Sequence, residues 1–304
     1  MRLSLVLAAV AVLAAPAAPA FAAQTAEDFQ VYVLRDLNLI GNNISHRIAV
    51  GGNATFTSTS IGGATADLPG SLVVGGNLTY LNGGSINGGA LVGGTKTAPS
   101  YLPVSAGQAM LPVDFAAENL RLTALSATLA GKAANGTAGV MWGGLNLTGL
   151  DAGLNVFTID AATLSSIYLG SVNIASGSQV LINVTGDTVN LHGGLNFYNA
   201  SNILWNFADA TTINAGGLSL SGTILAPKAK FVGSGGSLSG DLIVRDFQGA
   251  MSFNDAGYAG NLLKPSITGG LGNAVPEPGV WTMMILGFAA VGAMLRRRRA
   301  VLAL

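Results

Sequence analysis

The sequence predicts a mainly β chain wound as a β-solenoid, with one α-helix packed alongside it. The first observation behind this prediction is a repeat, because residues 48–55 (IAVGGNAT) recur 24 positions later as residues 72–79 (LVVGGNLT). The second is composition, since 43 glycines accompany abundant Ile, Leu and Val while cysteine is absent. Short apolar strands punctuated by glycine pairs are typical of a solenoid, in which stacked coils bury one continuous core.

Taken in order, the β body opens with residues 29–39, an apolar and β-branched stretch that predicts a strand. After the first two repeats, residues 90–94 (ALVGG) follow at a spacing of 18. Downstream, residues 220–226 (LSGTILA) recur 18 positions later as residues 238–244 (LSGDLIV). A β-sandwich is the alternative, but the spacing of these repeats is longer than the usual spacing of its strands.

The glycine and asparagine residues of the repeats predict further features of the structure. We expect the glycine pairs to adopt positive φ at tight corners, where each coil changes direction. Asn53, Asn77 and Asn146 occupy equivalent positions after the glycine pairs. They are predicted to point inward and to form a ladder of amides from coil to coil.

Residues 114–134 break this pattern and predict a helix. They are rich in Ala and Leu, and Asp114 is a suitable N-cap. One helical stripe, which predicts packing along the β body, contains Phe115, Leu122, Leu125 and Leu129. Residues 97–105, before the helix, form a predicted proline-containing loop. Beyond Ala250 the repeat fades, and residues 251–274 are predicted to be a flexible tether.

Residues 1–22 have the features of a cleaved signal peptide. Arg2 supplies the positive charge, residues 3–13 the apolar core, and Ala20 and Ala22 the small residues before the cleavage site. The mature domain is therefore expected to start near residue 23 and to fold outside the cytoplasm. Because the chain has no cysteine for disulfides, its stability must come from a packed core.

The C-terminal tail, residues 275–299, has three parts. Pro276, Glu277 and Pro278 form an elbow that disfavours helix. Residues 280–295 form an apolar run without a charged side chain. As a helix this run is about 24 Å long, slightly under the ~30 Å hydrocarbon core, and it predicts a marginal transmembrane helix. A cytoplasmic stop is predicted at Arg296, Arg297, Arg298 and Arg299, with residues 300–304 as a cytoplasmic tail.

This tail resembles the PEP-CTERM sorting signal in its PEPxxW form, because Trp281 follows Glu277 at the expected place. The resemblance implies recognition by a bacterial membrane transpeptidase of the exosortase class. It also implies export, transient anchoring in the inner membrane through the C-terminal helix, and delivery to the cell surface or extracellular matrix of a Gram-negative bacterium. An ordinary C-terminal membrane anchor is the alternative.

The body resembles the choice-of-anchor A family over most of residues 24–250. The matching stretches include residues 31–34 (VYVL), 43–53 (NISHRIAVGGN) and 112–117 (PVDFAA). Residues 202–244 also look like the right-handed, ice-binding-like β-solenoid, which carries a helix alongside its coils. The resemblance implies one extracellular adhesin domain over residues 23–250. Family members often end with a Glu- and His-containing segment, whereas this chain has residues 249–254 (GAMSFN) there.

Charge and ionisable residues argue against nucleic-acid binding and catalysis. Residues 24–275 keep nine of the 14 basic and 13 of the 14 acidic residues, a formal charge of −4, which disfavours nucleic acid as a partner. His46 and His192, the only histidines, are expected in turns or on the surface. Asp241 and Asp246 do not share a strand face, so a salt-bridged exposed face with Arg245 is expected there instead of a catalytic pair. We expect no enzyme, no cofactor and no metal.

Binding surfaces are the remaining candidates. Outward rows of Thr, Ser and Asn suit carbohydrate binding or self-association. Stacking on sugars is a candidate role for Tyr80, Tyr101, Trp142 and Tyr168, whereas Trp205 is expected in the core. Ice binding is disfavoured because the threonines are irregularly spaced. The expected function is a surface adhesin that binds exopolysaccharide or copies of itself. An extracellular carbohydrate-active enzyme using the Asp241 face and a purely structural matrix component are the alternatives.

Overall fold

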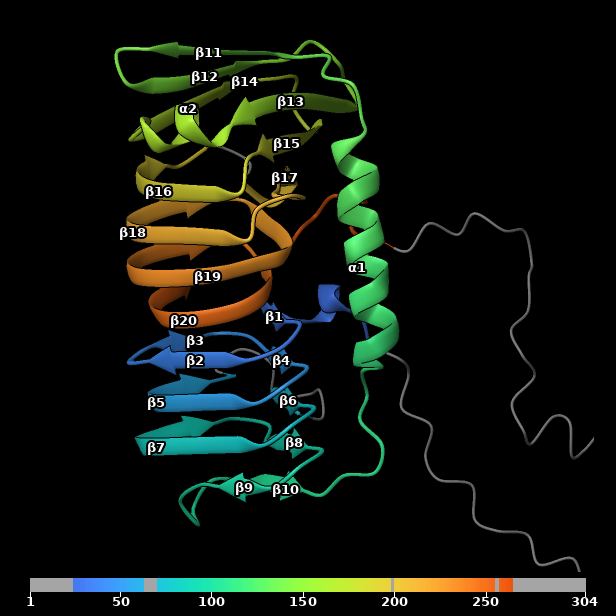
Figure 1. Ribbon diagram of the computed structural model, residues 1–304, viewed down its shortest axis with the longest axis vertical. Coiled ribbons are helices and arrows are strands. Elements are labelled where there is room, and N and C mark those ends of the chain that lie inside the picture. Colours follow the sequence, from blue (N-terminus) through green and yellow to red (C-terminus); the bar gives the residue numbers. More distant parts are fainter. Residues whose placement is uncertain (1–23, 63–69, 198–199, 255–256, 265–304) are drawn as a thin grey trace, which may run out of the picture. The chain divides into compact units, whose positions relative to one another are not determined.

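Strands from successive turns of the chain lie side by side in parallel, so that each coil stacks on the one before it (Figure 1). The computed structural model describes residues 24–62, 70–197, 200–254 and 257–264. They belong to one unit, Ala23–Lys264. The predicted signal peptide and C-terminal tail, with their site residues Ala20, Ala22, Pro276, Glu277, Pro278, Trp281 and Arg296 to Arg299, lie outside the described residues.

The elements fall into two groups along the chain, separated by the long helix. The first group contains η1 (Ala26–Asp28), β1 (Val31–Val33), β2 (Leu37–Ile40), β3 (Asn43–Ile44), β4 (Ile48–Val50), β5 (Ala54–Ile61), β6 (Leu72–Val74), β7 (Leu78–Ile86), β8 (Ala90–Val92), β9 (Lys96–Thr97) and β10 (Val104–Ala106). The helix and the second group are α1 (Phe115–Ala130), β11 (Thr137–Met141), β12 (Gly144–Thr148), β13 (Leu154–Asp160), α2 (Ala161–Ser165), β14 (Leu169–Asn173), β15 (Gln179–Thr185), β16 (Thr188–Leu195), η2 (Ala200–Asn202), β17 (Ile203–Asn206), β18 (Thr212–Ser221), β19 (Thr223–Ser239) and β20 (Leu242–Asn254).

The order of the coils differs from the order of the sequence. The chain begins in the middle of the stack and winds from β1 to β10 at one end (Figure 1). Helix α1 then carries it along the side to the other end, from which β11 to β20 wind back. The last strand, β20, pairs in parallel with β1, β2 and β3. We call this contact between the first and the last coil the seam.

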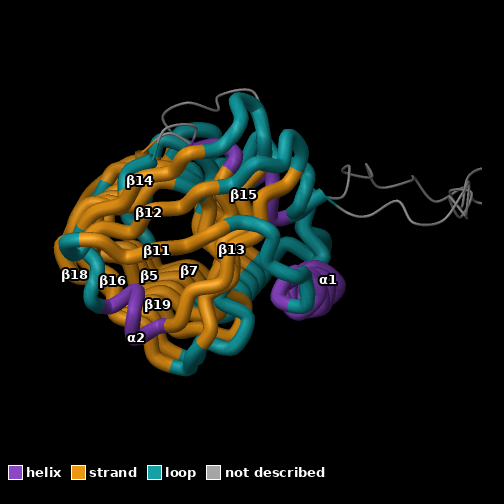
Figure 2. Tube along the Cα trace, turned by 90° about the horizontal axis from the view of Figure 1, so that it is seen from above, coloured by secondary structure: helices purple, strands orange, loops and turns teal. Residues whose placement is uncertain are grey.

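The coils present three faces around the core, and Figure 2 shows the strands enclosing it with α1 outside. Face A contains β13, β15, β17, the starts of β19 and β20, β1, β4, β6, β8 and β10. Face B contains β16, β18, the middle parts of β19 and β20, β2, β5, β7 and β9. Face C contains β11, β12, β14, the ends of β16, β18, β19 and β20, β3, and the ends of β5 and β7.

The core confirms the prediction of a mainly β chain with a packed apolar interior. Trp205 is fully buried, as expected, and the Nε1–H of its indole donates to the carbonyl oxygen of Ser221 at 3.0 Å. Aromatic rings also stack from coil to coil, with Phe56 over Tyr80 at a centroid distance of 5.4 Å and Phe231 over Phe247 at 5.8 Å. Each coil therefore buries its inward side chains against the next one.

The repeats found in the sequence coincide with the register of the strands. Ile48 pairs with Leu72, and Leu72 pairs with Ala90, as the alignment of residues 48–55, 72–79 and 90–94 requires. Ile224 likewise pairs with Leu242.

The glycine pairs of these three repeats, however, do not have the predicted conformation, whereas Gly143 and Gly193, which open two other pairs, do have positive φ. Gly51, Gly75 and Gly93 are not among the glycines with positive φ. A β-carbon on Gly93 would lie only 2.5 Å from the carbonyl oxygen of Gly75, and one on Gly75 would collide with the carbonyl oxygen of Gly51. Glycine is needed here because the backbones of successive coils approach closely, and a side chain does not fit between them.

Helix α1 covers face A. The carboxylate of Asp114 accepts a hydrogen bond from the backbone N–H of Ala117 at 3.0 Å, so the predicted N-cap is confirmed, and the helix ends at Ala130, not at residue 134. Leu122 and Leu129 are buried, and Phe115 and Leu125 pack against the same cluster as Leu181, Leu204 and Leu225 of face A. The short helix α2 was not predicted.

The asparagine ladder exists but lies outside the core. The side-chain oxygen of Asn53 accepts from the backbone N–H of Asn77 at 3.0 Å, and that of Asn77 from Thr95 at 2.8 Å, at an exposed corner. Asn146 is separate from it and is exposed on β12. Buried amides do occur, and two of them, Asn183 and Asn206, hydrogen-bond through their side chains at 2.9 Å beneath α1. The prediction of an inward ladder through the repeat asparagines was therefore wrong.

The predicted tether also begins too early. Strand β20 continues to Asn254, and residues 257–264 pack on the domain with Leu263 buried. Of residues 251–274, those from 265 onward lie outside the described part of the chain. Among the described residues there is no helix with both the length and the apolar character needed to span a membrane, and the predicted span, residues 280–295, is not among them.

Candidate functional site

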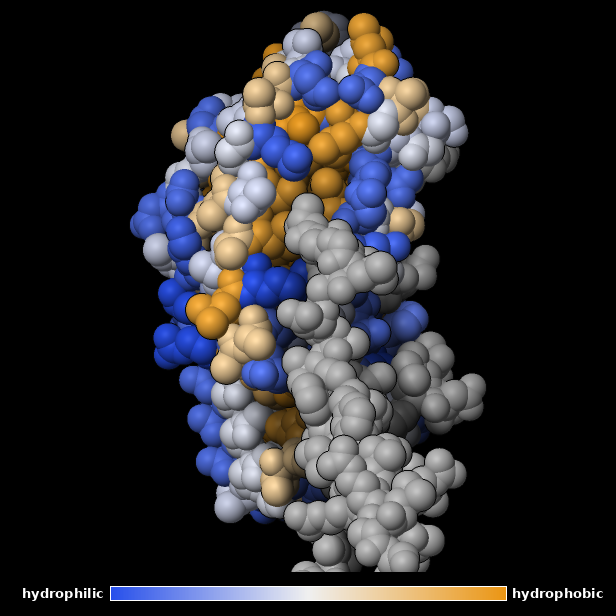
Figure 3. All heavy atoms as spheres, turned by 90° about the vertical axis from the view of Figure 1, so that its right-hand side faces the viewer, coloured by the Kyte–Doolittle hydropathy of each residue, from blue (hydrophilic) through white to orange (hydrophobic). Residues whose placement is uncertain are grey.

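The three faces differ in how much of their outward surface is covered by other parts of the chain. Face A is covered by α1 and by residues 257–264, so its outward side chains belong to a second apolar cluster. On the side of the domain where α1 lies, apolar side chains form a band between polar ones (Figure 3). Faces B and C carry no such cover among the described elements, and they are the surfaces available for a ligand.

Face B presents one outward side chain per coil in a continuous row. In stacking order the row consists of Asn190, Asn214, Val232, Gln248, Asn38, Thr55, Thr79 and Thr97. Neighbouring members lie about 4.8 Å apart, which is the spacing of hydrogen-bonded strands. Seven of the eight side chains carry an amide or a hydroxyl group, so we call this set the polar row.

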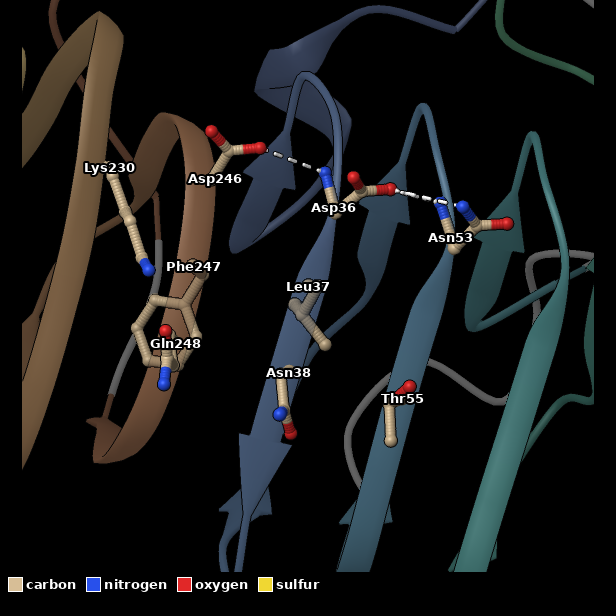
Figure 4. Close-up of a pocket in the computed structure, with 9 residues that line it drawn as sticks. All are labelled: Asp36, Leu37, Asn38, Asn53, Thr55, Lys230, Asp246, Phe247 and Gln248. Atoms are coloured by element: carbon tan, nitrogen blue, oxygen red, sulfur yellow. Dashed lines mark hydrogen bonds between the residues drawn. The ribbon is translucent and has the colours of Figure 1, made fainter.

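A polar cavity of about 400 Å³ interrupts face B at the seam (Figure 4). It is lined by Asp36, Leu37, Asn38, Asn53, Thr55, Lys230, Asp246, Phe247 and Gln248. The strand pairing explains its position, because β20 pairs with β2 through only three residue pairs and with β3 through one. The ladder is therefore incomplete where the first and last coils meet.

Charges in the seam cavity are partly satisfied by neighbours. The carboxylate of Asp246 accepts from Arg245 Nε at 2.7 Å and lies 3.7 Å from Arg35 Nε. The carboxylate of Asp36 accepts from the backbone N–H of Asn53 at 2.8 Å. Lys230 has no ion pair with any described residue. Its side chain extends from β19 alongside the strand that carries Gln248 (Figure 4).

A second polar cavity, of about 450 Å³, lies at the same level of the stack. It is lined by Gly41, Asn42, Asn43, Ser58, Ser252 and Asn254. The hydroxyl of Ser252 donates to the side-chain oxygen of Asn42 at 3.3 Å, so this cavity also bridges the first and the last coil. The seam thus concentrates hydroxyl, amide and charged groups on the open side of the domain.

Comparison with protein families assigns the fold to a known group. A family profile described as "Putative Ice-binding-like adhesive domain" matches residues 22–255. The chain belongs to this family. A second profile, described as a PEP-CTERM protein-sorting motif, matches residues 274–299 and so covers the predicted Pro276, Glu277, Pro278 and Trp281. Together they mark the chain as an exported cell-surface protein with a sorting signal.

Two further comparisons bear on the adhesive domain. The solved structures include a similar chain, described as the crystal structure of an ice binding protein from an Antarctic biological consortium. The two are 15% identical with a TM-score of 0.35, over 82% of this chain and 94% of the other. No curated protein matches the sequence.

The aromatic residues of the adhesive domain are divided between core and surface. Tyr80 is buried and donates a hydrogen bond to the carbonyl oxygen of Thr59, so its predicted role in stacking on sugars was wrong. Tyr101, Trp142 and Tyr168 are exposed, but none of them lines either seam cavity. The residues that line the seam cavities are instead mainly polar.

The ionisable residues considered from the sequence, His46, His192, Asp241, Arg245 and Asp246, lie in different surroundings within the described part of the chain. Among the described residues, no three His, Cys, Asp or Glu side chains gather as a potential metal site. His46 lies half-buried between β3 and β4, which agrees with the predicted turn, whereas His192 lies within β16. Arg245 does not pair with Asp241, with which it was expected to share a salt-bridged face; its Nε lies 2.7 Å from the carboxylate of Asp246 instead.

Asp241 was wrongly placed on an exposed face. It is only 4% exposed, and its carboxylate accepts hydrogen bonds from the backbone N–H groups of Gly257 at 3.2 Å and Tyr258 at 2.9 Å. Burial raises the pKa of Asp241 to about 6, against the opposing effect of these hydrogen bonds. The residue holds the segment after β20 on the domain and does not face a ligand.

This burial predicts a pH-dependent stability. Because the pKa of Asp241 is raised from 3.8 to about 6, its proton stabilises the folded state below pH 3.8, and this contribution is lost as the pH rises through 6. We expect Asp241→Asn, which cannot titrate, to gain about 2 kcal/mol in unfolding free energy relative to the unmodified protein between pH 4 and pH 7. Urea unfolding at several pH values measures this difference.

Asp209→Asn is the matched control, because the Asp209 carboxyl is exposed and pairs only with Lys228 at 3.6 Å. An Asp241→Asn curve parallel to that of the unmodified protein across this pH range would show that Asp241 does not titrate as argued.

Proposed function

We propose that the adhesive domain is a non-enzymatic, right-handed β-solenoid that holds linear polysaccharide along face B. Its chain would first be anchored in the inner membrane and then released to the surface or extracellular matrix by an exosortase-type enzyme. The observation that supports the binding role is the polar row, in which seven of the eight side chains carry an amide or hydroxyl, with the seam cavity at its centre.

The chemistry of the polar row fits a carbohydrate. Asn, Gln and Thr side chains each donate and accept hydrogen bonds, as sugar hydroxyls do. One such contact contributes only about 1 kcal/mol. Several contacts made at once along a single polymer chain act together, because each further contact is intramolecular once the first has formed. A stiff row of equally spaced groups is therefore suited to a repeating polymer and poorly suited to a small ligand.

Two alternatives receive less support. Ice binding requires a regular threonine array, whereas the polar row contains three threonines followed by Asn38, Gln248 and Val232. A carbohydrate-active enzyme using Asp241 would need this carboxyl on an open face, but it is buried under residues 257–264.

Removal of two amides from the centre of the row tests the proposal. We expect Asn38→Ala with Gln248→Ala to weaken polysaccharide binding about 30-fold, since two hydrogen bonds of roughly 1 kcal/mol each are lost. A glycan array with residues 24–264, which form their own compact unit, would identify the polymer, and calorimetric titration would give the affinity.

The control removes two exposed amides from outside face B, Asn146→Ala with Asn196→Ala. Equal binding by the unmodified protein and both double variants would exclude face B as the binding surface. Loss of binding in the control alone would assign the ligand to face C.

A further inference from the structure

Trp142 has an unusual position for its side chain. It lies in the two-residue turn between β11 and β12, where both Trp142 and Gly143 have positive φ, at +50° and +76°. Such turns favour Asn or Gly, because a left-handed backbone is unfavourable for residues with bulky side chains. The indole is also 91% exposed, so it gains almost nothing by packing within its own chain. Strain of this kind at an exposed aromatic residue points to a contact outside the domain.

Other apolar side chains surround this turn. Val140, Met141, Tyr168 and Leu169 are each between 49% and 58% exposed. Tyr168 and Leu169 lie beside the turn, because a β-carbon on Gly143 would meet the Tyr168 ring and one on Gly144 would meet Leu169, and Val140 and Met141 directly precede the turn in β11. A contiguous exposed apolar patch is uncommon on a monomeric soluble protein and typically marks an interaction surface. We call these five residues the Trp142 patch.

Strand β11 next to the patch is an open sheet edge. It pairs antiparallel with β12 on one side, and all five of its residues, Thr137–Met141, are exposed. It contains no charged residue and no proline, although these are the usual means of preventing edge-to-edge pairing. At the opposite end of the stack, by contrast, Lys96 donates to the carbonyl oxygen of Val104 at 2.6 Å, and Pro99 and Pro103 lie in the same terminal coil.

We propose that β11 pairs antiparallel with β11 of a second copy, joining two adhesive domains head to head. Pairing centred on Gly139 places Thr137 opposite Met141 of the second copy and obeys two-fold symmetry, so the assembly closes at two copies. The strand carries no charge and therefore meets its own copy without repulsion. The other end cannot be the partner surface in the same way, because its lysine and prolines disfavour strand addition.

The Trp142 patch supplies apolar area for this contact. A stable interface buries about 1,200 Å² or more in total. An aromatic side chain buries roughly 150–250 Å², so the two tryptophans supply on the order of 300 Å² and leave the remainder to the other patch residues and the paired strands. The dimer would carry two polar rows, which would raise the avidity for a polymer without any new sugar contact.

Sedimentation velocity over a range of concentrations tests this proposal, using residues 24–264, which form one compact unit. We expect a monomer–dimer equilibrium for the unmodified protein. Gly139→Lys is expected to raise the dissociation constant at least tenfold, because it places a charge on the pairing edge. The substitution fits the monomer, since a β-carbon at Gly139 has no atom within 4 Å.

Trp142→Asn separates association from folding. It should weaken the dimer at least tenfold and raise the melting temperature of the monomer by a few degrees, because Asn is favoured in this turn. Leu120→Lys is the matched control, since Leu120 is 74% exposed on α1, away from the edge, and its replacement should leave the dimer intact. A protein that stays monomeric at all concentrations, a dimer insensitive to Gly139→Lys, or open-ended polymers would each overturn the proposal. All of these outcomes are independent of polysaccharide binding.

Discussion

Replacement of Glu277 with alanine is expected to leave the full-length chain unprocessed in the inner membrane. Glu277 is the only charged residue between Val275 and Leu295, and it lies between two prolines within the matched sorting motif. Because proline disfavours helix, we expect the carboxylate to be the one charge there that a sorting enzyme can recognise. Immunoblots of membrane and released fractions, with the intact mass of the released chain, measure processing.

The control for this experiment lies within the same tail. Thr282→Ala alters a residue outside the Pro-Glu-Pro motif and should be processed like the unmodified chain. Glu277→Gln keeps the shape of the side chain without its charge and should be retained like Glu277→Ala. Release of both Glu277 variants at the normal rate would show that processing does not depend on Glu277 and would refute its role in recognition by the sorting enzyme.

The coil register was accessible from the sequence, but the order of the coils was not. Ile48, Leu72 and Ala90 pair as their repeats predict, because local periodicity records neighbours that are one repeat apart along the chain. Val31, however, pairs with Leu242 across the whole domain, and no local period reveals such a pair. The helix is the one indication in the sequence, since its 16 residues span about 24 Å, roughly five coils of 4.8 Å.

The chemical type of the candidate site, a set of outward polar side chains, was predictable from the sequence, but its position in the fold was not. Asn38 lies between the buried Leu37 and Leu39, and Gln248 follows the buried Phe247, so alternation alone predicts that both side chains face outward. Their juxtaposition depends on the seam and could not be inferred. Asp241 was misplaced for a related reason, because the segment that buries it, residues 257–264, has no repeat signal and was interpreted as part of a tether.

The structural role of the glycine pairs could not be determined from the sequence either. A glycine can be required because the backbone has positive φ or because another backbone approaches closely. Both requirements select glycine, so the sequence alone does not distinguish them. At Gly75 the structure distinguishes the two, since a β-carbon there would collide with the carbonyl oxygen of Gly51 and lie 3.3 Å from the Phe115 ring of α1. The glycine pair thus determines both how closely the coils stack and where helix α1 packs against them.

Gly75→Ala is accordingly expected to lower the unfolding free energy by about 3 kcal/mol, because the added methyl group must push apart two coils joined by backbone hydrogen bonds. The backbone N–H of Gly75 donates to the carbonyl oxygen of Val50 at 2.8 Å, so separation of the coils weakens this bond as well. Urea unfolding of residues 24–264 measures the change.

Gly139→Ala is the matched control, since Gly139 lies in a strand, has no positive φ, and has no atom within 4 Å of the place that an added methyl group would take. Its effect on the unfolding free energy should stay within about 0.5 kcal/mol. If both substitutions proved equally mild, the coils would have room for a side chain at Gly75, and close approach could not be the reason for glycine at the corners. A loss confined to Gly75→Ala would instead show that the distance between coils, and not backbone freedom, is the reason for glycine at this position.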